Sequence, residues 1–127
     1  MENESVRFET EGEVESGDPL SFILSDMMQN EHLRESSDLA EVVQRHLRQV
    51  HPGPNRGVKQ AGFRVLTGAF MPAVLVELGF GTNVAEAQFL ASPARQRSMA
   101  RAVAEATMEY FERYQRRVGG SAFGAHE

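Results

Sequence analysis

The chain has 127 residues, of which 41% are hydrophobic and 24% are charged. This length and composition are typical of a single globular domain and exclude a disordered or membrane-embedded protein. The net charge of −5 is concentrated in residues 2–15, and the remaining residues are neutral overall, so we expect no nucleic-acid-binding surface. Because cysteine is absent, a disulfide framework, a thiolate metal site and a Cys nucleophile are excluded.

The acidic N-terminal segment, residues 1–17, is expected to form a solvated loop or a weak edge strand rather than a binding tail. The longest mostly apolar stretch, residues 69–78, is about half the ~20 residues that a membrane-spanning helix requires. No signal-peptide pattern accompanies it. We therefore expect neither a membrane span nor a targeting segment in this sequence.

Two amphipathic helices are predicted after the acidic segment. Asp18 and Pro19 form a favourable N-cap and N1 pair, and apolar residues follow at helical spacing over residues 19–29. A second apolar stripe over residues 31–50 ends against the sequence HPGP at residues 51–54, which no helix tolerates. The polar residues 55–61 are expected to form a loop.

Two short runs after this loop are predicted to be strands. Residues 63–66 (FRVL) are aromatic and β-branched, and residues 71–78 are almost continuously apolar between glycines. Such a run is typical of a parallel strand that is covered by helices on both faces. The predicted fold class is therefore α/β, with a partial parallel sheet flanked by helices.

The C-terminal third is predicted to be helical. Asn83 is expected to cap a short helix that ends near Leu90, with Glu86 three residues after the cap as in a capping box. Ser92 and Pro93 are expected to begin the last helix, which we expect to stop at the glycines of positions 119 and 120. Residues 118–127 are predicted to be a disordered tail.

One charged residue is unexpected in the apolar run of residues 71–78. Glu77 follows the apolar residues 74–76, where a buried strand would otherwise carry only apolar side chains, and burying it unpaired would cost several kcal/mol. Ligands collect at the carboxyl ends of strands in open α/β sheets, so a working residue is expected here. A structural carboxylate that pairs with Arg64 or Lys59, or that caps a helix, is the alternative.

Three motifs follow one another in the part of the sequence that contains Glu77. They are NRGVKQA at residues 55–61, FRVL at residues 63–66 and MPAVLVELGF at residues 71–80, followed by Asn83. In this order they resemble the C-terminal part of the catalytic domain of zinc-dependent N-acetylmuramoyl-L-alanine amidases, which cut peptidoglycan stem peptides from muramic acid. The resemblance extends in weaker form over residues 18–117.

The resemblance implies roles for particular residues. Glu77 would be the general base that takes a proton from a zinc-bound water and returns it to the leaving amine. Asn55, Arg56 and Lys59 would lie beside the site and contact substrate. Peptidoglycan would be the substrate, and the location would be periplasmic or extracellular.

The zinc ligands of this family are not found in the sequence. The family binds zinc through a His in a DxGHGG-like strand end, a Glu, and a His in a SIHAN-like strand end, and none of these motifs occurs here. The four histidines, at positions 32, 46, 51 and 126, contain no pair at i, i+4 spacing. We expect zinc as the cofactor of a complete domain whose ligands would precede Met1, and no metal site in this chain alone.

Several functional interpretations remain open. The leading one is the C-terminal half of an amidase domain bearing Glu77. The alternative is a non-catalytic module that binds peptidoglycan or completes a domain with a complementing N-terminal chain, and a truncated gene product is a third. By resemblance, residues 19–29 are a candidate regulatory helix that an activator would move. Serine hydrolase chemistry is disfavoured, because Ser21, Ser36 and Ser37 have no neighbouring base in the sequence.

Overall fold

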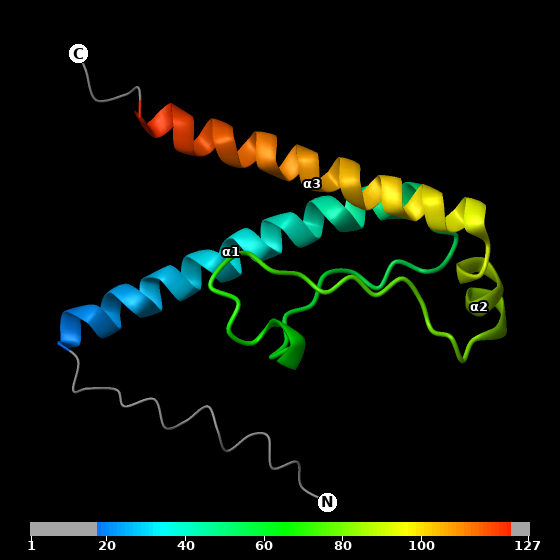
Figure 1. Cartoon of the computed structure of the whole chain (residues 1–127), viewed down its shortest axis with the longest axis horizontal. Helices are drawn as coiled ribbons and strands as arrows, with labels where there is room; N and C mark the ends of the chain where they lie inside the picture. Colours follow the sequence, from blue (N-terminus) through cyan, green and yellow to red (C-terminus); the bar gives the residue numbers. More distant parts are fainter. Residues whose placement is uncertain (1–17, 123–127) are drawn as a thin grey trace, which may run out of the picture.

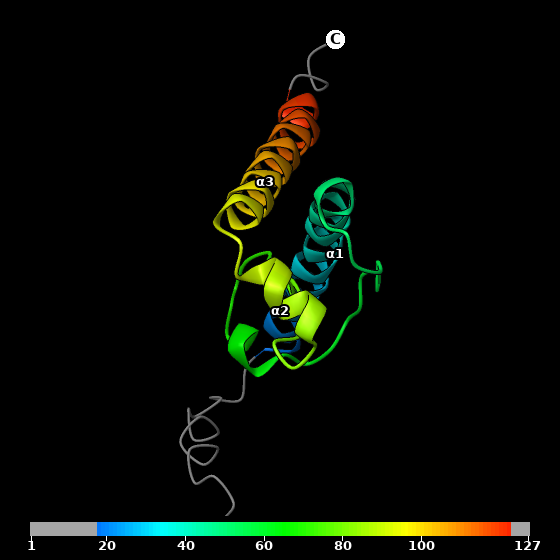
Figure 2. The same ribbon diagram turned by 90° about the vertical axis from the view of Figure 1, so that its right-hand side faces the viewer.

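The computed structural model describes residues 18–122, in which two long helices pack against each other and a long connection runs between them (Figure 1). Helix α1 spans Pro19–Val50, the 3-10 helix η2 spans Arg64–Leu66, α2 spans Val84–Leu90 and α3 spans Pro93–Ala122. Helix α1 contacts α3, and α2 contacts α3. In an end-on view, α2 lies below the start of α3 and in front of part of α1 (Figure 2).

Helix α1 is a single helix of 32 residues, so the prediction of two helices broken near residue 30 is wrong. Its predicted start is confirmed, because the Asp18 side chain accepts a hydrogen bond from the Leu20 N–H (3.3 Å) and Pro19 follows it. No Gly or Pro interrupts the helix near residue 30. The Asn30 side chain instead donates to Asp26 one turn earlier (3.3 Å), which is compatible with a continuous helix.

The hydrophobic core is small and lies between the second half of α1 and the first half of α3. Its fully buried members are Val42, Val43, Leu47, Met99, Ala102 and Ala106. The two alanines are four residues apart, so they share one face of α3 and let the helix backbones approach closely. Burying one Val or Leu side chain contributes roughly 1.5–3 kcal/mol, so this cluster accounts for the packing of the two helices.

The predicted sheet is wrong, because no strand is present within residues 18–122. Residues 64–66 form η2, and the Leu66 N–H bonds back to the Phe63 carbonyl (2.9 Å). Residues 73–80 are extended but have no neighbouring strand to complete a ladder. Their side chains still alternate as in a strand: Val76 and Leu78 pack against the core, whereas Glu77 is exposed.

The ends of α2 and α3 test the remaining helix predictions. The cap of α2 is confirmed, because the Asn83 side chain accepts from the Glu86 N–H (3.1 Å), and α3 begins at Pro93 as expected. Helix α3 continues through both glycines to Ala122, so the predicted stop is wrong, whereas the disorder predicted for residues 118–127 stays a prediction. An interior glycine costs only about 1 kcal/mol relative to alanine, which a long helix tolerates. The predicted loop or strand over residues 1–17 and the rest of the predicted tail lie outside the described residues.

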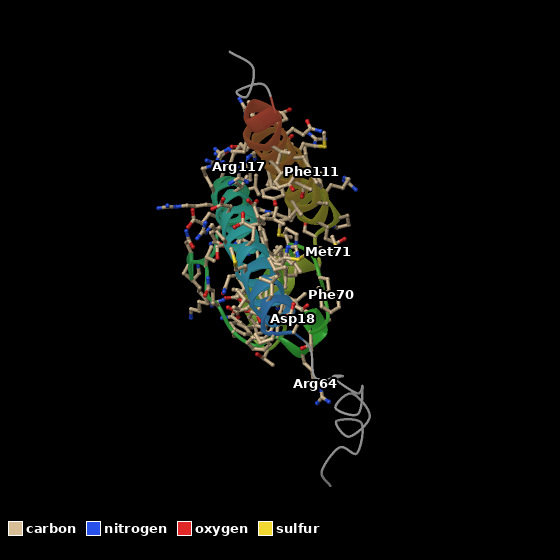
Figure 3. The ribbon with its side chains drawn as sticks, turned by 90° about the vertical axis from the view of Figure 1, so that its left-hand side faces the viewer. Asp18, Arg64, Phe70, Met71, Phe111 and Arg117 are labelled. Carbon is tan, nitrogen blue, oxygen red and sulfur yellow. The ribbon has the colours of Figure 1, made fainter. Side chains whose placement is uncertain are left out.

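The first half of α1 packs against no other described helix. Large apolar side chains along it are at least half exposed, and they are Leu20, Phe22, Ile23, Leu24, Met27, Met28 and Leu33. Phe70 and Met71 of the connection and Phe111 of α3 are exposed as well (Figure 3). None of the helices in residues 18–122 is both long enough and apolar enough to span a membrane.

Candidate functional site

A groove of about 870 Å³ lies between α1 and the connection that follows it. One wall is α1 from Gln29 to Arg48 together with its C-cap His51, and the other is formed by residues of the connection between Gly53 and Phe80. In Figure 1 the connection leaves the end of α1, passes along that helix to η2, and returns to α2. The motifs singled out in the sequence therefore share one groove, because the connection doubles back beside α1.

Two serines of α1 hold the connection in place. Ser36 Oγ accepts a hydrogen bond from the Ala73 backbone N–H (2.9 Å), and Ser37 Oγ accepts one from the Gln60 side chain (2.9 Å). From the sequence, both serines are candidates only as nucleophiles. Their observed role is to bind the two arms of the connection to one helix, which fixes the width of the groove.

Glu77 lines this groove and is exposed to solvent. The expectation that it ends a buried strand is wrong, because residues 18–122 contain no strand. Within residues 18–122 neither Arg64 nor Lys59 forms an ion pair with it, and Arg64 extends away from the helices (Figure 3). Glu77 is thus an accessible carboxylate without a hydrogen-bonding partner among the described residues.

Asn55 organises the beginning of the NRGVKQA motif. Its Oδ1 accepts a hydrogen bond from the Gly57 N–H (2.8 Å) and a second from the Gln44 side chain on α1. Gly57 has a φ of 74°, a conformation that favours glycine. The asparagine side chain thereby shapes a tight turn and ties it to the groove wall.

Arg56 is held on the opposite side of this turn by Glu86 of α2. Its guanidinium lies 3.1 Å from Glu86 Oε1 and stacks over the Phe80 ring at 4.7 Å from the centroid. The other Glu86 oxygen accepts from the Phe80 N–H (2.6 Å), so the predicted return contact of a capping box to Asn83 is replaced by a contact to Phe80. This backbone hydrogen bond, helped by Arg56, lowers the pKa of Glu86.

Lys59 lies on the wall of the same groove and is exposed. No carboxylate of residues 18–122 lies within ion-pair distance of its ammonium group. The structure therefore brings Asn55, Arg56, Lys59 and Glu77 to one groove. Asn55 and Arg56 have structural partners there, whereas Lys59 and Glu77 have none among the described residues.

Comparison with known proteins identifies the family. The sequence model described as N-acetylmuramoyl-L-alanine amidase matches residues 10–109, which is most of the chain and includes the whole groove. The chain belongs to the N-acetylmuramoyl-L-alanine amidase family. The resemblance carried by the three motifs is thereby confirmed.

Curated relatives of this amidase-family chain come from several bacteria. N-acetylmuramoyl-L-alanine amidase AmiA of Escherichia coli is 34% identical over 92 residues, which are 72% of this chain and 32% of AmiA. AmiC of Neisseria meningitidis is 34% identical over 68% of this chain and 21% of its own length. LytC of Bacillus subtilis is 37% identical over 60% of this chain and 15% of its own length. The chain thus spans about a third or less of these relatives, and no solved structure matches it.

The described part of this amidase-family chain does not by itself fit a zinc ion. Within residues 18–122 no group of three or more His, Cys, Asp or Glu side chains is placed to hold a metal. The His46 ring bonds to Glu109 (2.7 Å), and both nitrogens of His51 are engaged by backbone groups of Leu78 and Gly53. We therefore derive no chemical step through a metal from these residues.

Two residues of the site were not recognised as such from the sequence. Glu86 was seen only as part of a cap, although its position three residues after Asn83 is the signal that places it near the turn. His51 was seen only as a residue before a proline, and its contact with Leu78 spans 27 positions. No local pattern reports such a contact.

Proposed function

We propose that this chain supplies the catalytic carboxylate and part of the substrate groove of an N-acetylmuramoyl-L-alanine amidase. The reaction is hydrolysis of the amide that joins the lactyl group of N-acetylmuramic acid to the L-alanine of a peptidoglycan stem peptide. The observation that carries the proposal is the accessible Glu77 on the groove wall, without a partner among the described residues. Family membership supports the assignment.

In the proposed mechanism Glu77 moves one proton. Its carboxylate accepts a proton from the water that attacks the amide carbonyl, and the protonated carboxyl then donates this proton to the nitrogen as the C–N bond breaks. A carboxylate that is free of ion pairs is available to accept a proton, which an ion pair with Arg64 or Lys59 would oppose. Zinc, as the cofactor that the family resemblance implies, would lower the pKa of the attacking water toward ~7.

The substrate-binding roles of Asn55, Arg56 and Lys59 follow from their partners. Asn55 and Arg56 are committed to the turn and to Glu86, so we assign them to the shape of the groove. Lys59 keeps its ammonium group available and is the residue we expect to bind a carboxylate of the stem peptide. Because peptidoglycan lies outside the cytoplasmic membrane, the site of action would be periplasmic or extracellular.

Substitution of the proposed base tests this function. Glu77→Gln keeps the size of the side chain but cannot accept the proton, so we expect the release of dye-labelled fragments from peptidoglycan to fall by roughly 10²–10⁴-fold. The assay compares the variant with the unaltered chain, each as part of a complete amidase domain that supplies the zinc ligands.

The matched control is Glu105→Gln, which removes an exposed carboxylate on α3 that does not line the groove. This variant should retain the hydrolytic rate of the unaltered chain. Hydrolysis by Glu77→Gln at that same rate would remove Glu77 from the mechanism and overturn the proposal.

A non-catalytic peptidoglycan-binding module is the second candidate. It is supported by the apolar side chains of Val58, Leu75 and Phe80, which line the groove and are 40–52% exposed. Co-sedimentation with purified peptidoglycan distinguishes the two functions. A chain that sediments with peptidoglycan but releases no fragments, even as part of a complete domain that supplies the zinc ligands, would favour the binding module over the hydrolase. A complementing chain or an activator remains a proposed partner by resemblance alone.

A further inference from the structure

The imidazole of His51 joins the end of α1 to the segment that carries Glu77. Its Nε2 lies 2.6 Å from the Leu78 carbonyl oxygen, and the Gly53 backbone N–H lies 3.0 Å from its Nδ1. Since the Gly53 N–H is a donor, Nδ1 must accept and Nε2 must carry the proton. One neutral tautomer therefore makes both hydrogen bonds at once.

The His51 ring packs closely against neighbouring residues. The side chain is half-buried, and the edge of the ring packs on Phe89 of α2, with centroids 4.9 Å apart and an interplanar angle of 64°. A Cβ atom placed on Gly53 would lie 2.7 Å from Cε1 of the ring, closer than such atoms approach in proteins. Position 53 therefore has to be glycine for His51 to keep this place.

The hydrogen bond between His51 and the Leu78 carbonyl is important because residues 73–80 lack the hydrogen bonds that normally fix a strand. Within the described part of the chain, three side chains bond to this backbone: Ser36 to Ala73, His51 to Leu78, and Glu86 to Phe80. One backbone group joins them, since the Asn83 N–H donates to the Phe80 carbonyl (3.1 Å). A slip of one residue in an extended segment turns every side chain to the other face. Such a slip would move Glu77 from its exposed position toward the core.

We propose that His51 is a positioning residue for Glu77. By holding the adjacent Leu78 carbonyl, it fixes the register of residues 73–80 so that Leu78 packs against the core and Glu77 stays exposed. His51 acts through Leu78 and does not contact the reacting atoms. The importance of this hydrogen bond for hydrolysis rests on the function proposed for Glu77. The positioning of residues 73–80 by His51 does not depend on that function.

Two substitutions of His51 each retain only one of the two hydrogen bonds that its ring makes. In His51→Gln the amide nitrogen reaches the former place of Nε2 and can donate to Leu78, whereas in His51→Asn the amide oxygen reaches the place of Nδ1 and can accept only from Gly53. We expect NMR spectra of the full chain to show Glu77 and Leu78 amide signals near their original positions in His51→Gln. In His51→Asn and His51→Ala these signals should shift or broaden, while the signal of Ala106 in the core stays in place.

The ring itself provides an independent readout. The ¹⁵N shifts of His51 should be those of the tautomer with the proton on Nε2. Unchanged Glu77 and Leu78 signals in both His51→Asn and His51→Ala would overturn the proposal, and so would ring shifts of the opposite tautomer.

A double-mutant cycle tests the coupling between position 53 and the ring. Gly53→Ala should displace the Glu77 and Leu78 signals by forcing the ring away, and it should add no further displacement in a His51→Ala background, where no ring is present. Gly62→Ala is the matched control, because a Cβ there would meet nothing within 4 Å. Full additivity of Gly53→Ala and His51→Ala would contradict the proposal.

Failure of this inference can be told apart from failure of the proposed function. If the His51 variants displace residues 73–80 but Glu77→Gln still hydrolyses peptidoglycan normally, the hydrolytic role of Glu77 is wrong. The positioning role of His51 is then still supported. If the His51 variants leave the segment in place and Glu77→Gln is inactive, the catalytic role stands and His51 has no positioning role.

Discussion

Single polar side chains hold α1 and α3 together across long distances in the sequence. Glu35 of α1 is only 6% exposed, and its Oε2 accepts hydrogen bonds from Tyr110 (2.8 Å) and Arg117 (2.7 Å) of α3. Arg117 also binds Asp38 (3.0 Å), so the carboxylates of one helix share a cation of the other. A buried carboxylate that lost these partners would be strongly destabilising, so this cluster determines how the two helices align.

Removal of the Tyr110 hydroxyl tests this cluster. Tyr110→Phe keeps the ring but leaves a buried carboxylate oxygen with one partner fewer, so we expect the free energy of unfolding to fall by about 1–3 kcal/mol in urea denaturation. Tyr114→Phe removes an exposed ring's hydroxyl and should change the stability by less than about 0.5 kcal/mol. Equal stability of the two variants would show that the Tyr110 hydrogen bond is not stabilising.

The same hydroxyl predicts an alkaline limit to stability. Burial, together with the Glu35 carboxylate, raises the pKa of Tyr110 from 10.0 to about 12. Because the folded pKa lies above the unfolded one, this contribution is fully present below pH 10 and is lost as the pH rises toward 12. In Tyr110→Phe the loss of stability between these pH values should be smaller than in the unaltered chain.

At the scale of secondary structure elements, helix ends agree with local capping rules, except where a helix is long. The starts at Asp18, Asn83 and Pro93 are confirmed because each depends on residues within one turn. The stop predicted at Gly119 and Gly120 is wrong, because extending an existing helix requires far less free energy than starting one.

Substituting these two glycines tests whether the end of α3 is helical. No atom lies within 4 Å of a Cβ placed at Gly119 or Gly120, so alanine fits at both positions. We expect the double Gly→Ala variant to favour the local helix by about 1 kcal/mol per residue and to slow amide hydrogen exchange there. Exchange that is equally fast in both proteins would indicate that these residues are not helical.

At the scale of the whole molecule, a small core, two polar clusters and a groove are combined with a large exposed apolar surface on the first half of α1. The second cluster is centred on Glu109 of α3, which binds Arg45 (2.6 Å), His46 (2.7 Å) and Arg113 (2.6 Å). The hydrogen bond from His46, with the two arginines, lowers the pKa of Glu109. The packing of α1 on α3 is therefore linked to the charge of this carboxylate.

This linkage predicts weakening in acid. Because the folded pKa of Glu109 lies below the unfolded value of 4.5, its contribution is fully present above pH 4.5 and is lost as the pH falls through the folded pKa. Urea denaturation should show a decline in stability across this range, and the decline should be smaller in Glu109→Gln. An identical acid dependence in Glu109→Gln would assign the decline to other carboxylates, of which Glu86 is the first candidate.

The sequence by itself determined the family and the helix starts at Asp18, Asn83 and Pro93. These depend on short motifs and on caps, which act within a few residues. Only the tertiary structure decided that residues 73–80 form no sheet, that Glu77 is exposed, and that His51 holds Leu78. An apolar run predicts a strand only if another strand is available to pair with it, and within residues 18–122 α1 and α3 cover one face while no strand pairs with it. Burial and long-range hydrogen bonds are properties of neighbours in space, which the local pattern of residues does not specify.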